Sequence, residues 1–412
     1  MIILVLNCRF CSEPVTNIFV DLGIAPLSNA FLKKEMLNDV EEKFALCVYV
    51  CDNCFLVQLP EFEKPENIFK DYAYFSSYSS TWLEHAENYV NMMIKKFHIN
   101  EKSVVTEIAS NDGYLLQFFK EKNIPVLGIE PAANVAKVAK EKGIPTITKF
   151  FGVNTANELK KEGKQSDLIV GNNVLAHVPN INDFVKGMKI LLNSDGIITM
   201  EFPHLMQLIE KNQFDTIYHE HFSYFSFYTV IQIFEKHNLK IFDVEELTTH
   251  GGSLRIYATH IENSTHILSN TVKNLLDKEM KFGITDMSTY TNFQENIIKI
   301  KNQLLNFVLS VKNEKKKIIC YGAAAKGNTL LNYCGIGKEN IEYVVDINSH
   351  KQGLYLPGSH LQIKKPEEIK KDKPDFLLIL PWNIKEEIMK DISFIHDWNG
   401  KFIIPIPKVT II

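Results

Sequence analysis

The chain has 412 residues, 45% of them hydrophobic, and its 45 lysine and arginine residues nearly balance 49 aspartate and glutamate residues, for a net charge of -4. This length predicts two or three domains, and the charge balance argues against a bulk nucleic-acid binder or a polybasic membrane anchor. No apolar run is long enough to span a membrane. The apolar residues 1–10 lack the basic region and cleavage site of a secretion signal, so we expect a first strand there and a cytoplasmic protein.

Residues 1–70 are predicted to form a small metal-binding domain. They contain two Cys-x2-Cys pairs, which are Cys8, Cys11, Cys51 and Cys54, and one further thiol, Cys47. In a reducing compartment such clustering favours metal binding over disulfides, and four thiolates suit tetrahedral Zn²⁺. A site filled by four thiolates leaves no position for water, so the metal should be structural. The alternative is a set of ordinary buried cysteines.

Residues 71–265 alternate between helical and strand-like periodicity. We expect helices at 81–97, 113–123 and 134–143, and strands at 103–109, 125–130, 166–173 and 196–203. Such alternation predicts a parallel, doubly wound sheet. Residues 266–312 then read as a helical connector, with one apolar face made of Ile297, Ile300, Leu304, Val308 and Val311. A second α/β domain is predicted at 313–412, with strands at 318–322, 341–348, 375–383 and 401–407 and helices at 327–335 and 384–392.

The segment "VVTEIASNDGYLL" has the pattern of a strand, a turn of small residues and a helix. Glu107 ends the strand, and Ala109, Ser110 and Gly113 keep the turn small enough for a ligand to approach its backbone. The next strand ends in Glu130, which could accept hydrogen bonds from both hydroxyls of a ribose. A dinucleotide-binding fold is the competing interpretation, and the absence of its G-x-G-x-x-G fingerprint counts against NAD here.

The segment "IICYGAAAKGNTLL" repeats this pattern near the carboxyl terminus. Its helix start and Lys326 would favour a phosphate, and Asp346 after the following strand would suit a ribose. The spacing is also compatible with NAD, and the domain could instead be a scaffold that binds nothing.

The stretch "YHEHFSYF", from Tyr218 to Phe225, could be a metal site, a proton-transfer site or a polar strand edge. If it is extended, His219 and His221 lie on one face, and Tyr218 and Glu220 on the other.

Several segments together resemble the three-domain sugar C-methyltransferases. These are "SNDG" at 110–113, "NNVLAHVPN" at 172–180, "YHEHFSY" at 218–224, "HGGSLR" at 250–255, "YGAAAKGN" at 321–328 and the two cysteine pairs. The resemblance covers nearly the whole chain. It implies an α/β protein with a small zinc-binding domain, a central class I S-adenosylmethionine (SAM) methyltransferase domain and a carboxyl-terminal Rossmann-like domain. The implied substrate is a nucleotide diphosphate keto sugar, and the implied cofactors are SAM and Zn²⁺.

The resemblance also implies which residues form the site. The catalytic set is Tyr218, Glu220, His221, Asn173 and His177, and the SAM-binding set is Glu107, Ala109, Ser110, Asn111, Gly113, Glu130 and Asn172. The substrate-binding set comprises Tyr78 and Ser79, from the tyrosine- and serine-rich residues 71–82, together with Lys326, Asn328 and Asp346. Lys149, near the end of the third strand, departs from the acidic or amide residue usual beside adenine, which leaves the adenine contacts open. For His250 and Arg255, a structural and a functional role carry equal weight.

C-methylation requires a carbon nucleophile, which a ketone provides by forming an enolate on deprotonation. Because histidine titrates near neutrality, His221 is our candidate base, with Tyr218 and His177 as donors to the enolate oxygen and Glu220 as an orienting group. We expect a monomer that binds neither nucleic acid nor membranes. The alternatives are a sugar O-methyltransferase, a zinc-bearing scaffold without turnover, and an NAD-dependent oxidoreductase of sugar nucleotides.

Overall fold

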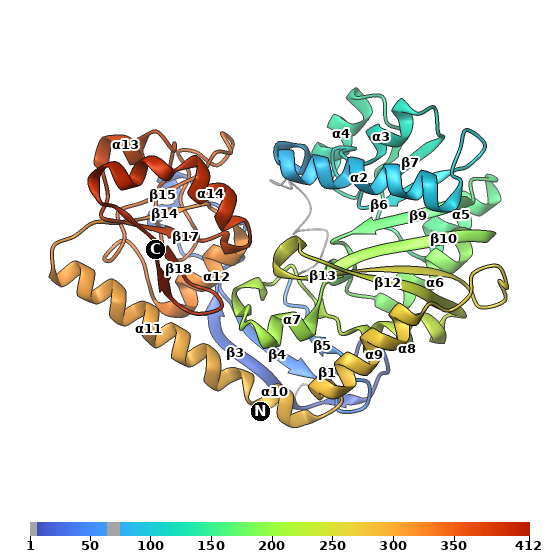
Figure 1. The fold of residues 1–412 in the computed structure, drawn as a ribbon, viewed down its shortest axis with the longest axis horizontal. Coiled ribbons are helices and arrows are strands. Elements are labelled where there is room, and N and C mark those ends of the chain that lie inside the picture. The colour runs from blue at the N-terminus through green and yellow to red at the C-terminus, as the bar shows by residue number, and fades with distance from the viewer. Residues whose placement is uncertain (1–5, 64–74) are drawn as a thin grey trace.

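The computed structural model describes residues 6–63 and 75–412, and within them the strands form four sheets. Residues 1–5 of the expected first strand, and residues 71–74 of the tyrosine- and serine-rich segment, lie outside the described residues. Figure 1 shows two lobes, one around the central sheet and one around the carboxyl-terminal sheet, with the amino-terminal strands between and below them.

The central sheet of the described residues has seven strands in the order β12-β13-β10-β9-β6-β7-β8. Within it, β13 is antiparallel to both its neighbours, and the other pairs are parallel. This order, with one reversed strand next to the edge, is the arrangement of class I SAM-dependent methyltransferases. The strands are β6 (Val105–Ile108), β7 (Val126–Ile129), β8 (Thr146–Ile147), β9 (Ser166–Asn172), β10 (Leu192–Pro203), β12 (Leu239–Leu247) and β13 (Ser253–His260).

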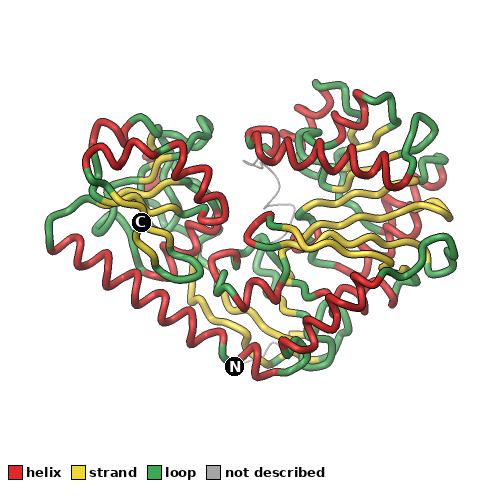
Figure 2. Tube along the Cα trace, viewed as in Figure 1, coloured by secondary structure: helices red, strands yellow, loops and turns green. Residues whose placement is uncertain are grey.

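Helices cover both faces of the central sheet, as Figure 2 shows. One apolar core lies under α2 (Ser80–Phe97), α3 (Leu116–Glu121) and α4 (Ala133–Glu141). A second core, on the opposite face, lies under α5 (Val153–Lys161), α6 (Ile181–Leu191) and α8 (Phe227–Lys236). Because both faces are buried, the ligand-binding turns at the carboxyl ends of the parallel strands are held on a rigid frame.

The amino-terminal sheet contains a strand from a distant part of the chain. Its order is β11-β5-β4-β3, with β3 (Asn17–Ala25), β4 (Phe44–Val50) and β5 (Val57–Gln58) from the first domain. Its fourth strand, β11 (Ser223–Tyr224), begins one residue beyond "YHEH" and pairs with β5. The short hairpin of β1 (Leu6–Asn7) and β2 (Pro14–Val15) stands beside this sheet.

The carboxyl-terminal sheet has the order β16-β15-β14-β17-β18-β19, with an antiparallel β19 at one edge. Its strands are β14 (Ile318–Tyr321), β15 (Val344–Val345), β16 (Ile363–Lys364), β17 (Phe376–Ile379), β18 (Lys401–Ile404) and β19 (Thr410–Ile411). Its helices are α12 (Ala325–Cys334), α13 (Glu368–Asp372) and α14 (Lys385–Asp391). The strand expected at 341–348 is therefore much shorter than predicted, because only two of its residues pair with neighbours.

The helical connector runs along the outside of the molecule from the central to the carboxyl-terminal lobe (Figure 1). It consists of α9 (Asn270–Phe282), α10 (Met287–Thr291) and α11 (Phe293–Asn313). The apolar face predicted for α11 is buried, as Ile297, Ile300, Leu304, Val308 and Val311 show. The ring of Phe293 stacks on Phe19 of β3 at 4.7 Å between centroids, so amino-terminal strands and connector share one core. Burying each such side chain contributes roughly 1.5–3 kcal/mol.

The predicted fold class is confirmed: the chain is an α/β protein with a small amino-terminal domain, a central doubly wound sheet and a Rossmann-like carboxyl-terminal sheet. Among the described helices, none is long and apolar enough to cross a membrane.

Candidate active site and zinc centre

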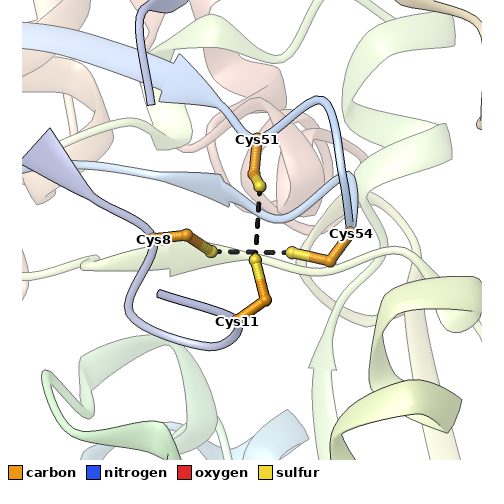
Figure 3. A group of neighbouring side chains, drawn as sticks. All are labelled: Cys8, Cys11, Cys51 and Cys54. Atoms are coloured by element: carbon orange, nitrogen blue, oxygen red, sulfur yellow. Dashed lines mark hydrogen bonds between the residues drawn. The ribbon is translucent and has the colours of Figure 1, made fainter. Parts of the chain in front are cut away.

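The four cysteines of the two Cys-x2-Cys pairs point toward one common centre (Figure 3). Their sulfur atoms all lie within 4.8 Å of one another, and the Cys8–Cys54 and Cys11–Cys51 sulfur pairs are each 3.5 Å apart. A tetrahedral zinc with Zn–S bonds of about 2.3 Å separates its sulfurs by about 3.8 Å. The cluster therefore has the size and donor set of a structural Zn²⁺ site.

The two loops that carry these cysteines are built alike. In the first, the Ser12 amide donates to the Cys8 carbonyl at 2.9 Å, and in the second the Phe55 amide donates to the Cys51 carbonyl at 2.9 Å. Ser12 and Phe55 both have left-handed backbone angles, with φ of 69° and 58°. Matching turns of this kind bring the two thiols of each pair to one side. Cys47, by contrast, lies in β4 outside the cluster.

The turn after β6 has an unusual backbone. Ala109, Asn111 and Gly113 all have positive φ, of 57°, 49° and 76°. At Gly113 a Cβ atom would lie 2.9 Å from the side chain of Ile144, so a larger residue would displace the turn. The conformation turns this loop back across the end of the sheet, where open α/β sheets bind their ligands.

Glu130, directly after β7, holds this turn. Its carboxylate oxygens accept the amides of Asn111 at 2.9 Å and Ala132 at 2.8 Å. Burial raises the pKa of Glu130 to about 7, against the effect of these two hydrogen bonds. Each carboxylate oxygen accepts two hydrogen bonds in total, so Glu130 retains acceptor capacity for a ligand.

Several buried polar atoms around this turn have no hydrogen-bond partner among the described residues. They are the Ser110 hydroxyl, one Asp112 carboxylate oxygen and both amide atoms of Asn172. Buried polar groups are normally paired, so such a group of orphans fits a polar ligand. Glu107 is buried beside them, and burial raises its pKa well above the ordinary range. The donor and acceptor set suits the ribose and amino-acid ends of SAM.

We expect Glu130→Ala to raise the dissociation constant of SAM at least tenfold, measured by calorimetric titration. A hydrogen bond to a charged group contributes about 1.5–3 kcal/mol, and 1.4 kcal/mol is a factor of ten. Glu141→Ala is the matched control, because Glu141 is exposed at the end of α4 and 64% of its side-chain surface is accessible. If SAM binds Glu130→Ala as tightly as the wild type, the ribose lies elsewhere.

The "YHEH" segment is a turn and not an extended strand. The amide of His221 donates to the Tyr218 carbonyl at 2.9 Å, and regular pairing begins only at Ser223 in β11. His219 and His221 consequently do not share a face. His219 points to the amino-terminal sheet, where its Nε2 donates to the Ala45 carbonyl at 3.3 Å.

His221 is enclosed by other rings. Its centroid lies 4.0 Å from that of Tyr218 and 4.7 Å from that of His177. Its Nδ1 donates to the Thr216 carbonyl at 2.9 Å, which leaves the lone pair on Nε2. The pKa of His221 is held well below the usual value, first by burial and then by the nearby imidazole of His177, which disfavours a second positive charge, so the imidazole of His221 is neutral.

Glu220 points to a residue of the amino-terminal domain. One of its carboxylate oxygens accepts the side-chain amide of Asn29 at 2.7 Å. Burial raises the pKa of Glu220 to about 7, while Asn29 and the positive charge of Lys351 oppose the shift. Asn29 was not anticipated from the sequence, because nothing in "PLSNAF" shows that it approaches a residue 191 positions away.

Asn173 and His250 come together beside this group. The Asn173 amide donates to Nε2 of His250 at 3.1 Å, and Trp82 of α2 contacts the His250 ring edge-to-face at 5.3 Å. Burial lowers the pKa of His250 to about 4. Arg255, in contrast, forms a buried ion pair in which its Nε donates to Glu201 at 2.7 Å.

The expected substrate residues lie at the junction of the lobes. Tyr78 is exposed and its hydroxyl is 3.1 Å from Nε2 of His350, whereas the Ser79 hydroxyl caps α2 by accepting the Trp82 amide. Asn328 is buried and donates to the Ser28 carbonyl at 3.4 Å.

The two remaining expected substrate residues belong to the carboxyl-terminal domain, where Lys326 lies in α12 and Asp346 directly follows β15. Lys326 donates to the side chain of Asn383 at 2.7 Å. Asp346 accepts the Ala323 amide at 2.7 Å. In the central domain, Glu130 likewise follows one strand and accepts a backbone amide from the turn after the neighbouring strand.

Three family models match consecutive parts of the chain. They are a zinc binding domain at residues 8–69, a methyltransferase domain at 82–244 and a C-methyltransferase C-terminal domain at 248–407. The chain is also 33% identical to the C-methyltransferase NovU of Streptomyces niveus over 406 residues, which are 98% of this chain and 96% of NovU. The chain belongs to the three-domain C-methyltransferases. It is thus a SAM-dependent methyltransferase with a zinc-binding domain.

Solved structures resemble part of this C-methyltransferase. The PH0226 protein of Pyrococcus horikoshii aligns with a TM-score of 0.38 at 14% identity, covering 48% of this chain and 99% of its own. The magnesium protoporphyrin IX methyltransferase of Synechocystis, solved with bound SAM, aligns with a TM-score of 0.34 at 12% identity, covering 47% of this chain and 88% of its own.

Proposed function

We propose that this C-methyltransferase places a methyl group on the ring carbon next to the ketone of a nucleotide diphosphate keto sugar. The observation that carries the proposal is the environment of His221, a neutral buried imidazole with Nδ1 fixed and Nε2 as its basic atom. SAM, when bound, supplies the electrophilic methyl group. The chain must then generate a carbon nucleophile, and a ketone makes the adjacent C–H acidic enough for a histidine base.

His221 removes the proton from that carbon through Nε2. Negative charge developing on the ketone oxygen favours the protonated imidazole beside it, which offsets the low pKa of His221 in the absence of substrate. Glu220, which Asn29 orients, lies in the same turn and is positioned to order the substrate.

Tyr218 is the better donor to the enolate oxygen. The Nδ1–H of His177 donates to the Glu220 carbonyl at 2.8 Å, and burial lowers the pKa of His177 to about 4. A neutral imidazole with Nδ1–H can only accept at Nε2, so the donor role expected for His177 is not available in this state. A tyrosine hydroxyl carries a proton that it can donate, and we assign the role to Tyr218.

The nucleotide end of the substrate is assigned to the carboxyl-terminal sheet. Lys326 at the start of α12 supplies a cation for the diphosphate, and Asp346 and Asn328 supply polar groups for the nucleoside. Tyr78 and Ser79 precede α2 on the other side of the junction and would contact the sugar.

Incubating the purified protein with SAM and a panel of keto sugar nucleotides tests the proposal. We expect one member of the panel to gain the mass of one methylene group, and nuclear magnetic resonance of the product to show a methyl on carbon. A methyl on oxygen would support sugar O-methylation instead. No mass gain with any keto sugar nucleotide would contradict the proposed substrate class.

A further inference from the structure

The carboxyl-terminal domain is tied to the segment that carries His221 by a buried side-chain hydrogen bond. Asp215 lies in the short helix η4 (Phe214–Thr216), and its side chain is fully buried. Its carboxylate accepts the indole N–H of Trp382 at 2.6 Å. Trp382 begins η6 (Trp382–Ile384), after β17 of the carboxyl-terminal sheet. The bond therefore crosses from the methyltransferase domain to its carboxyl-terminal neighbour.

The indole of Trp382 is fixed on its face and on its edge. Nζ of Lys326 lies 4.6 Å from the ring centroid and is itself held by Asn383. At the edge, Gly251 has φ of 92°, and a Cβ there would lie 2.6 Å from the indole. Only glycine fits this position, which accounts for one glycine of "HGGSLR". With face and edge fixed, the indole N–H is directed at Asp215.

The next residue transmits this contact to His221. Thr216 directly follows Asp215, and its carbonyl accepts Nδ1–H of His221 at 2.9 Å. The nitrogen that donates to this carbonyl carries the proton, so the other nitrogen carries the lone pair. The position of the Thr216 carbonyl thus decides which nitrogen of His221 is basic.

We propose that Asp215 and Trp382 are positioning residues through which the carboxyl-terminal domain holds His221 in the Nδ1–H form. The inference rests on the proposed role of His221 as the base. Burial raises the pKa of Asp215 to about 6, so an ionised carboxylate at this position lowers the stability of the folded protein. An apolar contact between the two domains would not carry this cost. A positioning function explains why an acid occupies the site.

The variant Trp382→Phe tests this contact, because it keeps an aromatic ring beneath Lys326 and removes the indole N–H together with the five-membered part of the indole. Trp398→Phe is the matched control: Trp398 lies in the same domain, and its indole N–H donates to the Pro374 carbonyl at 2.9 Å, away from His221. The tautomer of His221 is read from nitrogen resonances of ¹⁵N-histidine-labelled protein, assigned by their absence in His221→Gln.

We expect a single Nδ1–H form of His221 in the wild type and in Trp398→Phe, and a mixture of tautomers in Trp382→Phe. Methyl transfer should fall about tenfold in kcat in Trp382→Phe with an unchanged KM for SAM, since a misplaced catalytic group slows the chemical step.

A second pair of variants, at Asp215, keeps the test valid if Trp382→Phe does not fold. Asp215→Asn retains an acceptor oxygen and should keep the wild-type tautomer, whereas Asp215→Ala should lose it.

The outcomes separate the two proposals. An unchanged Nδ1–H form in folded Trp382→Phe or Asp215→Ala overturns the positioning role, whatever the activity. A shifted tautomer together with full methyl transfer overturns the role of His221 as base, and with it that part of the proposed function. The two proposals can be separated because the nitrogen resonances of His221 report its tautomer and do not depend on whether His221 acts as the base.

Discussion

His221→Gln is expected to lose methyl transfer by about 10²–10⁴-fold, the contribution of a well-placed general base. SAM affinity should be unchanged, because the imidazole faces Tyr218 and His177 and not the turn after β6. The measurement pairs steady-state rates, on the keto sugar nucleotide that accepts the methyl group, with calorimetric titration of SAM.

The matched control is His219→Gln, two positions away in the same turn. His219 donates to the Ala45 carbonyl in the amino-terminal sheet, so its loss should leave the rate within a few fold of the wild type. Equal losses in the two variants would point to a collapsed turn, and wild-type activity in His221→Gln would show that another group is the base.

Removing the zinc is expected to unfold the amino-terminal domain. Apparent binding free energies of structural zinc in small domains are about 10–16 kcal/mol, which exceeds the stability such a domain reaches without metal. Cys54→Ser should therefore lose the metal, measured as about one zinc per chain in the wild type, and lower the melting temperature. Activity should also fall, because this domain supplies Asn29 to Glu220 and pairs β5 with β11.

Cys47→Ser serves as the control, since Cys47 lies outside the four-sulfur cluster. It should retain one zinc and the wild-type melting temperature. A Cys54→Ser protein that is metal-free yet fully folded and active would contradict a structural zinc.

Local sequence patterns were sufficient to predict most of the parallel strands and the cysteine cluster. Alternating strands and helices are encoded by short-range periodicity, and two Cys-x2-Cys pairs specify a thiolate site with little tertiary information. The buried face of α11 followed from its helical spacing for the same reason.

Contacts between distant segments could not be predicted in this way. The alternation in "YHEH" suggested a strand, but Phe222 donates its amide to the Ala176 carbonyl at 2.7 Å and the preceding residues turn. Asn29 and Trp382 reach residues 214–221 from other domains, and no sequence periodicity indicates which side chains meet across such interfaces. The tautomer of His177 likewise depends on a single backbone carbonyl, that of Glu220.

The most direct test is hydrogen exchange at the carbon beside the ketone, in heavy water with S-adenosylhomocysteine in place of SAM. Enolate formation does not require methyl transfer, so the wild type should exchange this hydrogen for deuterium well above the rate without enzyme, whereas His221→Gln should not. Exchange by His221→Gln at the wild-type rate would contradict the assignment of the base, and a wild type that methylates without any exchange would contradict the enolate.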